Sequence, residues 1–276
     1  MRMKYIKTIK SLSVLACLIF LSACASKTGD NTATRNTSDN KGVLVLGGTG
    51  QLGSYHVKQL SDAGERVIVL ARTTSSFERL EGSDYEVVIG DLRNDSEVMA
   101  AVMESKPAVI IDASNYPGIR FEDGESFYWP SMRYQIAAAR AAGVTQIIRH
   151  SPRGARQMLT QPPSEGTRSD PRIINYMRDG ARAELALEQA GVEGSLAATI
   201  IYNRNLPPEP ADATGRGELL EELTVDGGIT RSDLARLTNT CILNEKCYGS
   251  IFNAVDAYLP PPNFDGRTRP NAPANP

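Results

Sequence analysis

The sequence predicts an α/β fold in a single domain, with a doubly wound parallel sheet followed by a small C-terminal lobe. Two observations favour this class. Short apolar runs alternate with helix-like segments from Val43 onward, as expected where helices connect parallel strands. The first run, Val43–Leu46, contains no polar residue, and unbroken apolar runs are typical of strands that are buried on both faces.

The later elements continue this alternation. Further strands are predicted over Val67–Leu70, Tyr85–Ile89, Ala108–Ile111, Gln146–Arg149 and Ala197–Tyr202. Helices are predicted over Tyr55–Leu60, Val98–Met103, Ile136–Ala142 and Asn175–Ala190. Glycine commonly ends a helix, and the end points expected for three of these helices are Gly64, Gly143 and Gly191. Thr230 and Asp233 fit a capping box that opens a last helix at Leu234.

A glycine-rich loop follows the first strand and precedes the first helix. It reads Gly-Gly-Thr-Gly-Gln-Leu-Gly over residues 47–53, and Gly48, Gly50 and Gly53 satisfy the G-x-G-x-x-G spacing. A helix N-terminus attracts anions through its unpaired N–H groups, and glycine lets the backbone approach a pyrophosphate closely. In this context the loop predicts a Rossmann-type dinucleotide site. The alternative is a glycine-rich turn that binds nothing.

Residues 1–23 are predicted to be a lipoprotein signal peptide. Basic residues precede an apolar segment, Leu12–Leu21, that is too short for a membrane span. The sequence Leu21-Ser-Ala-Cys24 resembles the lipobox of bacterial lipoproteins, which implies lipidation of Cys24. We therefore expect a protein of the bacterial cell envelope, anchored to a membrane by lipid and facing the periplasm or exterior. An uncleaved anchor or an ordinary signal peptide is the alternative, and either would also place the domain outside the cytoplasm.

The remaining chain divides into three parts. Residues 24–41 form the lipidated cysteine and a polar tether, 42–258 the folded domain and 259–276 a Pro-rich tail. The signal peptide carries four basic and no acidic residues, so its removal lowers the formal charge from −2 to −6. This balance gives no indication of nucleic-acid binding. The sequence also contains no pattern typical of a metal site.

Two cysteines, Cys241 and Cys247, lie near the end of the domain. An even pair in an oxidising compartment favours a disulfide. Two buried thiols are the alternative, because a continuous helix across both positions would hold the side chains apart.

The order of these motifs resembles the short-chain dehydrogenase/reductase superfamily, in its extended and atypical (NmrA-like, NAD(P)H-binding) branch. The resemblance runs from about Val43 to Val255 and includes Gly90-Asp91-Leu92, the stretch 229–235 and the stretch 252–256. It implies a nicotinamide dinucleotide as cofactor, with Asp91 and Leu92 beside the adenine. The other cofactor-binding residues that it implies are Gly47, Gly48, Thr49, Gly50, Gln51, Leu52, Gly53, Ala113 and Ser114.

The end of the second strand bears on the choice of cofactor. An acidic residue there would bind the ribose 2′-hydroxyl of NAD, but the strand is followed by Arg72. An arginine can pair with the 2′-phosphate of NADP, so NADP is favoured over NAD. An ordinary surface arginine is the alternative.

The catalytic residues depart from the superfamily pattern, in which a Tyr-x-x-x-Lys pair transfers the proton. Tyr176 is present, but Gly180 occupies the lysine position, and an unassisted phenol has a pKa of about 10. Ser151 matches the serine block, yet Pro152 stands where the working serine is often found. His150 is a further acid–base candidate. We therefore expect little redox turnover, and Tyr176 is either a catalytic residue or a packing residue.

Two other functions remain open from the sequence. One is an active NADPH-dependent reductase or isomerase acting on a small carbonyl or sugar-nucleotide substrate. The other is a non-catalytic scaffold that binds a protein partner. The sequence leaves the role of His56 open between a surface residue and a hydrogen-bonded residue. It also leaves open whether an aromatic cluster caps a substrate pocket or belongs to the core. That cluster comprises Phe121, Phe127, Tyr128, Trp129 and Tyr134.

Overall fold

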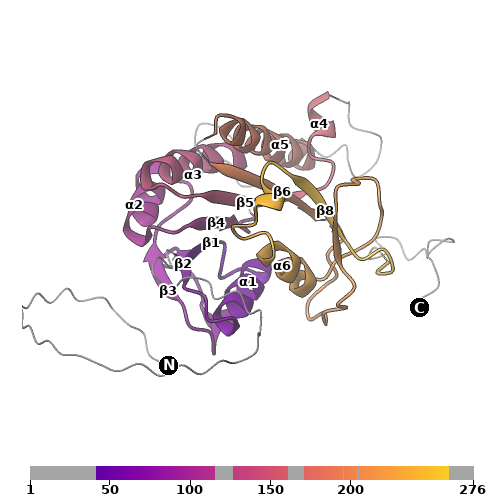
Figure 1. Ribbon diagram of the computed structural model, residues 1–276, viewed down its shortest axis with the longest axis horizontal. Helices are drawn as coiled ribbons and strands as arrows, with labels where there is room; N and C mark the ends of the chain where they lie inside the picture. Colours follow the sequence, from indigo (N-terminus) through magenta and orange to yellow (C-terminus); the bar gives the residue numbers. More distant parts are fainter. Residues whose placement is uncertain (1–41, 116–126, 161–170, 195, 204, 261–276) are drawn as a thin grey trace, which may run out of the picture. The chain divides into compact units, whose positions relative to one another are not determined.

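An eight-stranded sheet organises the fold (Figure 1). The computed structural model describes residues 42–115, 127–160, 171–194, 196–203 and 205–260. The strand order is β3-β2-β1-β4-β5-β6-β8-β7, and every neighbouring pair is parallel except β7 with β8. The strands are β1 (Val43–Leu46), β2 (Val67–Ala71), β3 (Glu86–Ile89), β4 (Val109–Asp112), β5 (Gln146–Pro152), β6 (Ala197–Asn203), β7 (Glu218–Leu220) and β8 (Ile251–Val255).

The strand order confirms the predicted doubly wound sheet. From β1 the chain moves outward to β2 and β3, and then crosses back to continue from β4 on the other side. The direction therefore reverses between β1 and β4, which is where ligands bind in sheets of this kind. The predicted signal peptide, Cys24, the tether and nearly all of the Pro-rich tail lie outside the described residues.

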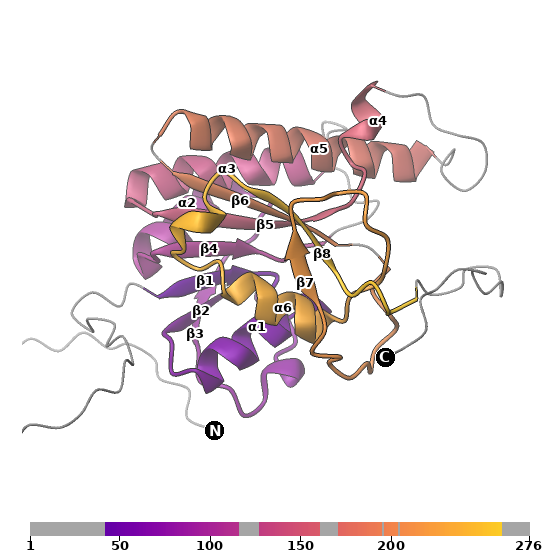
Figure 2. The same ribbon diagram turned by 45° about the vertical axis from the view of Figure 1, so that its right-hand side comes forward.

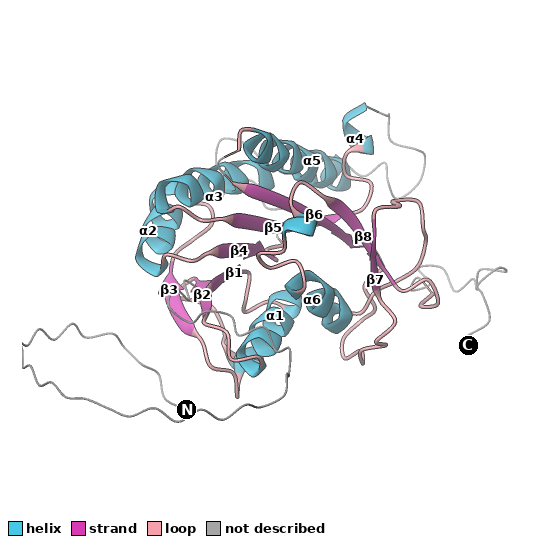
Figure 3. Cartoon of the chain, viewed as in Figure 1, coloured by secondary structure: helices cyan, strands magenta, loops and turns pink. Residues whose placement is uncertain are grey.

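Helices cover both faces of the sheet (Figure 3). One face carries α2, α3 and α5, and the other carries α1 and α6, an arrangement that the turned view also shows (Figure 2). The helices are α1 (Gln51–Asp62), α2 (Asp95–Ser105), α3 (Tyr128–Ala142), α4 (Gln157–Thr160), α5 (Pro171–Val192) and α6 (Arg231–Asn239), with 3-10 turns η2 (Glu78–Leu80) and η4 (Glu245–Cys247). None of the helices in these ranges is long and apolar enough to cross a bilayer.

Two hydrophobic cores result, one on each face of the sheet. Alternate side chains of a strand point to opposite faces. In β1, Leu44 and Leu46 pack into the core beneath α2, α3 and α5, whereas Val43 and Val45 pack into the core beneath α1 and α6. The unbroken apolar runs of the sequence are therefore explained by burial on both sides.

Some element boundaries differ from those predicted. The helix expected to end at Gly191 continues to Val192. Gly191 packs closely against β6, since a Cβ on it would lie 3.1 Å from the Cβ of Ala198, and Gly194 is the residue that turns left-handed, with a φ of 78°. The last helix begins at Arg231 instead of Leu234. Neither β7 nor β8 is evident from the sequence pattern.

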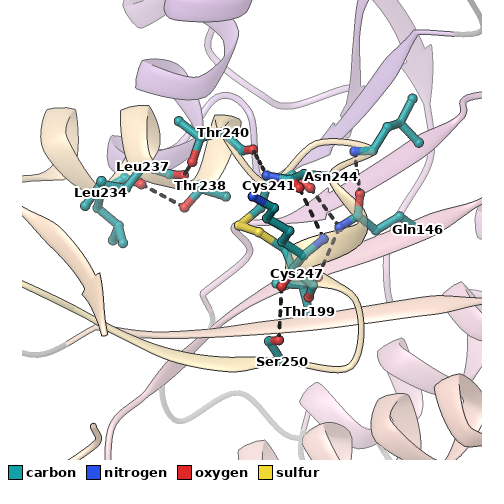
Figure 4. Close-up of a disulfide and its surroundings, with 12 residues drawn as sticks. Gln146, Thr199, Leu234, Leu237, Thr238, Thr240, Cys241, Asn244, Cys247 and Ser250 are labelled. Carbon is teal, nitrogen blue, oxygen red and sulfur yellow. Dashed lines mark hydrogen bonds between the residues drawn. A yellow bond between two sulfur atoms is a disulfide. The ribbon is translucent and has the colours of Figure 1, made fainter. Parts of the chain in front are cut away.

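The structure joins Cys241 and Cys247 in a disulfide, with Cα atoms 5.5 Å apart (Figure 4). The helix α6 ends before Cys241, so no continuous helix separates the two side chains. Gln146 donates a hydrogen bond to the carbonyl of Cys241 (3.0 Å), and Thr199 donates one to the carbonyl of Cys247 (2.8 Å). Because Gln146 and Thr199 lie early in β5 and β6, the disulfide loop lies at the amino ends of these strands, away from the glycine turn at the carboxyl end of β1.

Candidate functional site

A cleft of about 450 Å³ lies at the carboxyl ends of the strands, across the reversal point between β1 and β4. It brings together most of the site residues that the sequence predicts. Those that line it are Gly47, Thr49, Gly50, Gln51, Leu52, Arg72, Asp91, Leu92, Ala113, Ser114, His150, Ser151 and Tyr176. Gly48 and Gly53 do not line the cleft, and Cys24 lies outside the described residues.

The glycine turn packs too tightly for side chains. The N–H of Gly50 donates to the carbonyl of Gly47 (2.9 Å) and closes the turn. A Cβ on Gly53 would lie 2.1 Å from that same carbonyl oxygen, and one on Gly48 would lie 2.9 Å from a methyl of Val69. Gly48 and Gly53 therefore act indirectly, by allowing the turn that brings Gly47 and Gly50 to the cleft.

The N-terminus of α1 fits a pyrophosphate. Gln51 and Leu52, in its first turn, line the cleft. Gly50, the N-cap residue of α1, has no side chain that could accept a hydrogen bond from the first N–H groups of the helix. The described first turn of α1 also holds no acidic residue. The first N–H groups of this helix are thus left to an anion from a ligand.

Two charged residues of opposite sign mark the β2–β3 end of the cleft. Arg72 is exposed, and its backbone N–H donates to Ser75 Oγ (3.0 Å). The Asp91 carboxylate accepts from Arg93 Nε (3.0 Å), and these hydrogen bonds lower the pKa of Asp91, with a smaller contribution from the charge of Arg72. The positive charge expected for a 2′-phosphate is present at this end of the cleft.

A buried ion pair lies at the other end, between the last residue of β4 and the middle of β5. Arg149 Nη1 is 2.7 Å from Asp112 Oδ2, and each side chain is only 1% exposed. Asp112 also accepts from the backbone N–H and the hydroxyl of Ser114, which fixes the loop after β4. The guanidinium of Arg149 lies 5.0 Å from the ring centre of Tyr128.

Tyr176 lies in the cleft without a cationic partner at the lysine position. Its ring meets the ring of Tyr128 edge-on at 5.3 Å. Burial raises the pKa of Tyr176, and Tyr128 and the charge of Arg149 offset this only in part. One helical turn later, a Cβ on Gly180 would meet nothing within 4 Å among the described residues beyond its own helix backbone. Arg178 is turned away and donates to the carbonyl of Met158 (2.9 Å).

The hydroxyl of Ser151 is already engaged. It donates a hydrogen bond to the carboxylate of Glu184, which is completely buried. The same carboxylate accepts from the hydroxyl of Tyr202 (2.8 Å) and pairs with Arg156 Nε (2.9 Å). Because a serine has a single hydroxyl proton, Ser151 can offer only its lone pairs to a ligand in the cleft.

The two histidines form a buried pair. Their Nε2 atoms are 2.9 Å apart, and His56 Nδ1 lies 2.8 Å from Asn239 Oδ1. His56 is therefore a hydrogen-bonded interior residue, and the surface alternative is wrong. Burial lowers the pKa of His56 to about 4 and holds the pKa of His150 well below its ordinary value.

Further residues line the cleft that the sequence does not assign to the cofactor site. Asn115 directly follows the predicted Ala113–Ser114 pair, and Arg149 directly precedes His150, so adjacency to these residues is the available signal. The full set is Leu70, Ser75, Gly90, Asn115, Tyr128, Arg149, Pro152, Asn203, Leu206 and Arg231. Of the aromatic cluster, Tyr128 lines the cleft, Phe127 belongs to the core and Phe121 lies outside the described residues.

Within the described residues, no three histidine, cysteine or acidic side chains are grouped so that they could hold a metal ion. Several polar residues of the cleft are instead paired with buried side chains behind it: Arg149 with Asp112, Ser151 with Glu184 and His150 with His56. The arrangement is that of a site for a large organic ligand with an anionic centre.

Comparisons with known proteins agree with this geometry. Residues 47–245 match the family described as NAD(P)H-binding. A stretch of 131 residues is 34% identical to an uncharacterized chloroplastic protein of Arabidopsis thaliana. It covers 41% of this chain and 40% of the plant protein, so the chain spans about 40% of that relative's length.

Two solved structures show the same fold. An anaerobillin reductase from Escherichia coli O157:H7 has a TM-score of 0.65 at 19% identity, covering 79% of this chain and 98% of that one. A protein from Bacillus halodurans, assigned as an NAD-dependent epimerase/dehydratase, has a TM-score of 0.64 at 20% identity, covering 79% and 95%.

The buried state of His56 predicts a pH-dependent stability. Its folded-state pKa of about 4 lies below the ordinary 6.5, so the unfolded chain takes up the proton first as the pH falls. The contribution of His56 to stability is complete above pH 6.5 and is lost between 6.5 and 4, by an amount on the order of 3 kcal/mol. Burial also lowers the pKa of His150, which contributes in the same direction, so urea unfolding across this range should show a shallower decline for His56→Leu than for the wild type but not a flat profile. Parallel profiles for the two proteins would contradict the assignment.

Proposed function

The chain belongs to the NAD(P)H-binding family, and on this premise we propose that it is a lipid-anchored envelope protein that binds NADP(H) with little redox turnover. The observation that carries the low turnover is the state of Tyr176. This phenol lines the cleft with a raised pKa, and glycine stands where a lysine would lower it. Family membership supports the nicotinamide dinucleotide itself, whereas the preference for NADP, the low turnover and the anchor are proposals.

The chain's own residues would hold the dinucleotide along the cleft. The glycine turn and the N-terminus of α1 would bind the pyrophosphate through backbone N–H groups. Arg72 would meet the 2′-phosphate at the β2–β3 end. When bound, the dinucleotide supplies a hydride donor or acceptor.

Proton transfer is the step for which the cleft is poorly equipped. A phenol with a pKa above 10 is almost fully protonated at neutral pH and is a weak base and a weak acid. The hydroxyl of Ser151 is committed to a hydrogen bond that it donates to Glu184, and the low pKa values of both histidines keep them neutral. Each candidate acid–base group is thus held in one protonation state.

An active NADPH-dependent reductase or isomerase is the second candidate. It is favoured by the position of Tyr176, because the phenol lies in the same cleft as the glycine turn. The substrate in that case would be a small carbonyl compound or a sugar nucleotide. The two candidates differ in whether the wild-type protein oxidises NADPH.

The location outside the cytoplasm rests on the first 24 residues. A basic segment, a short apolar segment and the sequence ending at Cys24 resemble a lipoprotein signal. Lipoproteins typically cross the membrane unfolded, so this chain would meet its ligand only after export. A cleft without a suitable acid–base group is consistent with a compartment in which free NADPH is scarce.

The charge at the end of β2 predicts cofactor preference. NADP(H) should bind more tightly than NAD(H), and Arg72→Ala should narrow that difference by roughly 1–3 kcal/mol, the scale of a lost charge-assisted contact. Calorimetry with both cofactors measures the difference. Arg79→Ala is the matched control, because Arg79 is exposed nearby and does not line the cleft. Equal affinity of the wild type for both cofactors would remove the basis for the role of Arg72.

The missing lysine predicts that the purified protein oxidises little or no NADPH with generic aldehydes, ketones or quinones. A Cβ on Gly180 would have open space, although the residue is buried and does not line the cleft. We therefore expect Gly180→Lys to fold only if this face of the helix opens on the cleft, with a stability gain of about 1 kcal/mol from replacing glycine within a helix. Gly180→Ala supplies the helix effect without the charge. Ultraviolet titration should therefore show a lower phenol pKa for Tyr176 in Gly180→Lys than in Gly180→Ala. Robust NADPH oxidation by the wild type that is lost in Tyr176→Phe would instead establish the reductase.

The lipobox predicts that Cys24→Ser abolishes labelling by palmitate and releases the protein from membranes. The cysteine pair 241 and 247 provides the control, because its replacement should leave labelling unchanged. A Cys24→Ser protein that still takes up label and remains in the membrane fraction would refute the anchor.

A further inference from the structure

A chain of side-chain hydrogen bonds runs from α6 through α1 to the end of β5, and its direction can be read from one fixed point. Gln59 Nε2 lies 3.0 Å from the backbone carbonyl oxygen of Ser232. A carbonyl oxygen can only accept, so the amide nitrogen of Gln59 must face it. The other atom, Oε1, then accepts from Asn239 Nδ2 at 3.3 Å. This fixes the orientation of both amides.

The same direction continues through the two histidines. Asn239 presents Oδ1 to His56, so His56 carries its proton on Nδ1. A neutral imidazole has one proton, and Nε2 of His56 is therefore an acceptor. It must receive the hydrogen bond from Nε2–H of His150, which leaves the proton of His150 on Nε2 and a lone pair on Nδ1.

This last acceptor has no partner within the described residues. His150 Nδ1 is buried and makes no hydrogen bond there, although the residue lines the cleft. The side chain is buried to more than nine-tenths, with the residue 7% exposed. An unpaired buried acceptor costs folding free energy. This series of hydrogen bonds therefore indicates that the ligand supplies the missing donor.

The position of His150 indicates which part of the ligand it meets. A dinucleotide spans the reversal point of a doubly wound sheet, with one half on each side. Arg72 and Asp91 mark the β2–β3 side, which is the side of the adenine half. His150 lies in β5, which follows β4 on the side of the reversal point away from β2 and β3. It is therefore on the side of the nicotinamide half. The carboxamide of nicotinamide carries neutral N–H donors.

We propose that the chain from Ser232 to His56 positions His150 Nδ1 as the hydrogen-bond acceptor for the carboxamide N–H of the bound nicotinamide. The inference rests on the proposed dinucleotide binding. It assigns to His150 the discrimination between a ligand with a carboxamide and one with a carboxylate at this position. A carboxylate at the same position would place its oxygens against the lone pair of Nδ1. His56 and Asn239 are positioning residues, because they act only by fixing the proton of His150.

The binding test uses NADP⁺ and nicotinic acid adenine dinucleotide phosphate, which differ only in amide against acid. Calorimetry with the purified protein should give at least about tenfold tighter binding of NADP⁺, equivalent to 1.4 kcal/mol. His150→Phe should bring the ratio of the two affinities close to one. Asn239→Leu should also reduce it, because the proton of His56 is then free to move to Nε2. Tyr55→Phe is the control. Tyr55 precedes His56 in the sequence, but its hydroxyl donates to Glu209 (2.9 Å), which does not belong to this series of hydrogen bonds. The ratio of the two affinities should therefore persist.

Spectra of the wild-type protein test the inference even if the binding variants do not fold. The sequence contains only two histidines, so ¹⁵N-histidine spectra of the purified protein contain signals from only two imidazole rings. They should show His56 protonated on Nδ1 and His150 on Nε2, and NADP⁺ should shift the Nδ1 signal of His150 toward a hydrogen-bonded value. A His150 protonated on Nδ1, or equal affinity of the wild type for the two dinucleotides, would overturn the inference and leave dinucleotide binding intact. Failure to bind either dinucleotide would overturn the proposed function, and this inference with it.

Discussion

The buried ion pair between Asp112 and Arg149 is the interaction on which the inner end of the cleft depends. Both side chains are removed from water where the last residue of β4 adjoins the middle of β5. Removing one partner of such a pair leaves an uncompensated buried charge, at a cost of about 3–5 kcal/mol. The pair does more than neutralise charge, because Asp112 also holds Ser114 and accepts from Gln135 (3.3 Å). Arg149 in turn underlies Tyr128, against which Tyr176 packs.

The end of β5 distributes its polar side chains according to the alternation of a strand. Arg149 and Ser151 point to one face of the sheet and engage Asp112 and Glu184. His150 points to the other face and engages His56 on α1. Three consecutive residues thus belong to separate buried networks on two sides of the sheet. Each network fixes a proton in place, which suits orientation of a ligand better than transfer of a proton.

This distribution places the requirements for dinucleotide binding and for proton transfer on separate parts of the fold. The turn at Gly47–Gly53 depends on close backbone contacts and is independent of the residue at position 180. Proton transfer by Tyr176, in contrast, depends on a neighbouring cation that lowers the pKa of the phenol. Because the two requirements rest on different elements, α1 and α5, one can be lost without the other.

The sequence alone determined the parts that local spacing controls. The apolar runs predicted β1 to β6, and the glycine spacing located the turn before α1, because these depend on residues close together in the chain. The helix itself begins at Gln51, four residues before the predicted start at Tyr55. It could not locate the partner of His56, since His150 lies 94 residues away and is reached only when α1 packs on β5. Nor could it decide the disulfide, because the cysteine spacing is compatible with either outcome until α6 ends at Asn239. The burial of Arg149 was likewise decided by tertiary structure: only the pairing of β4 with β5 brings Asp112 beside it and makes a buried guanidinium tolerable.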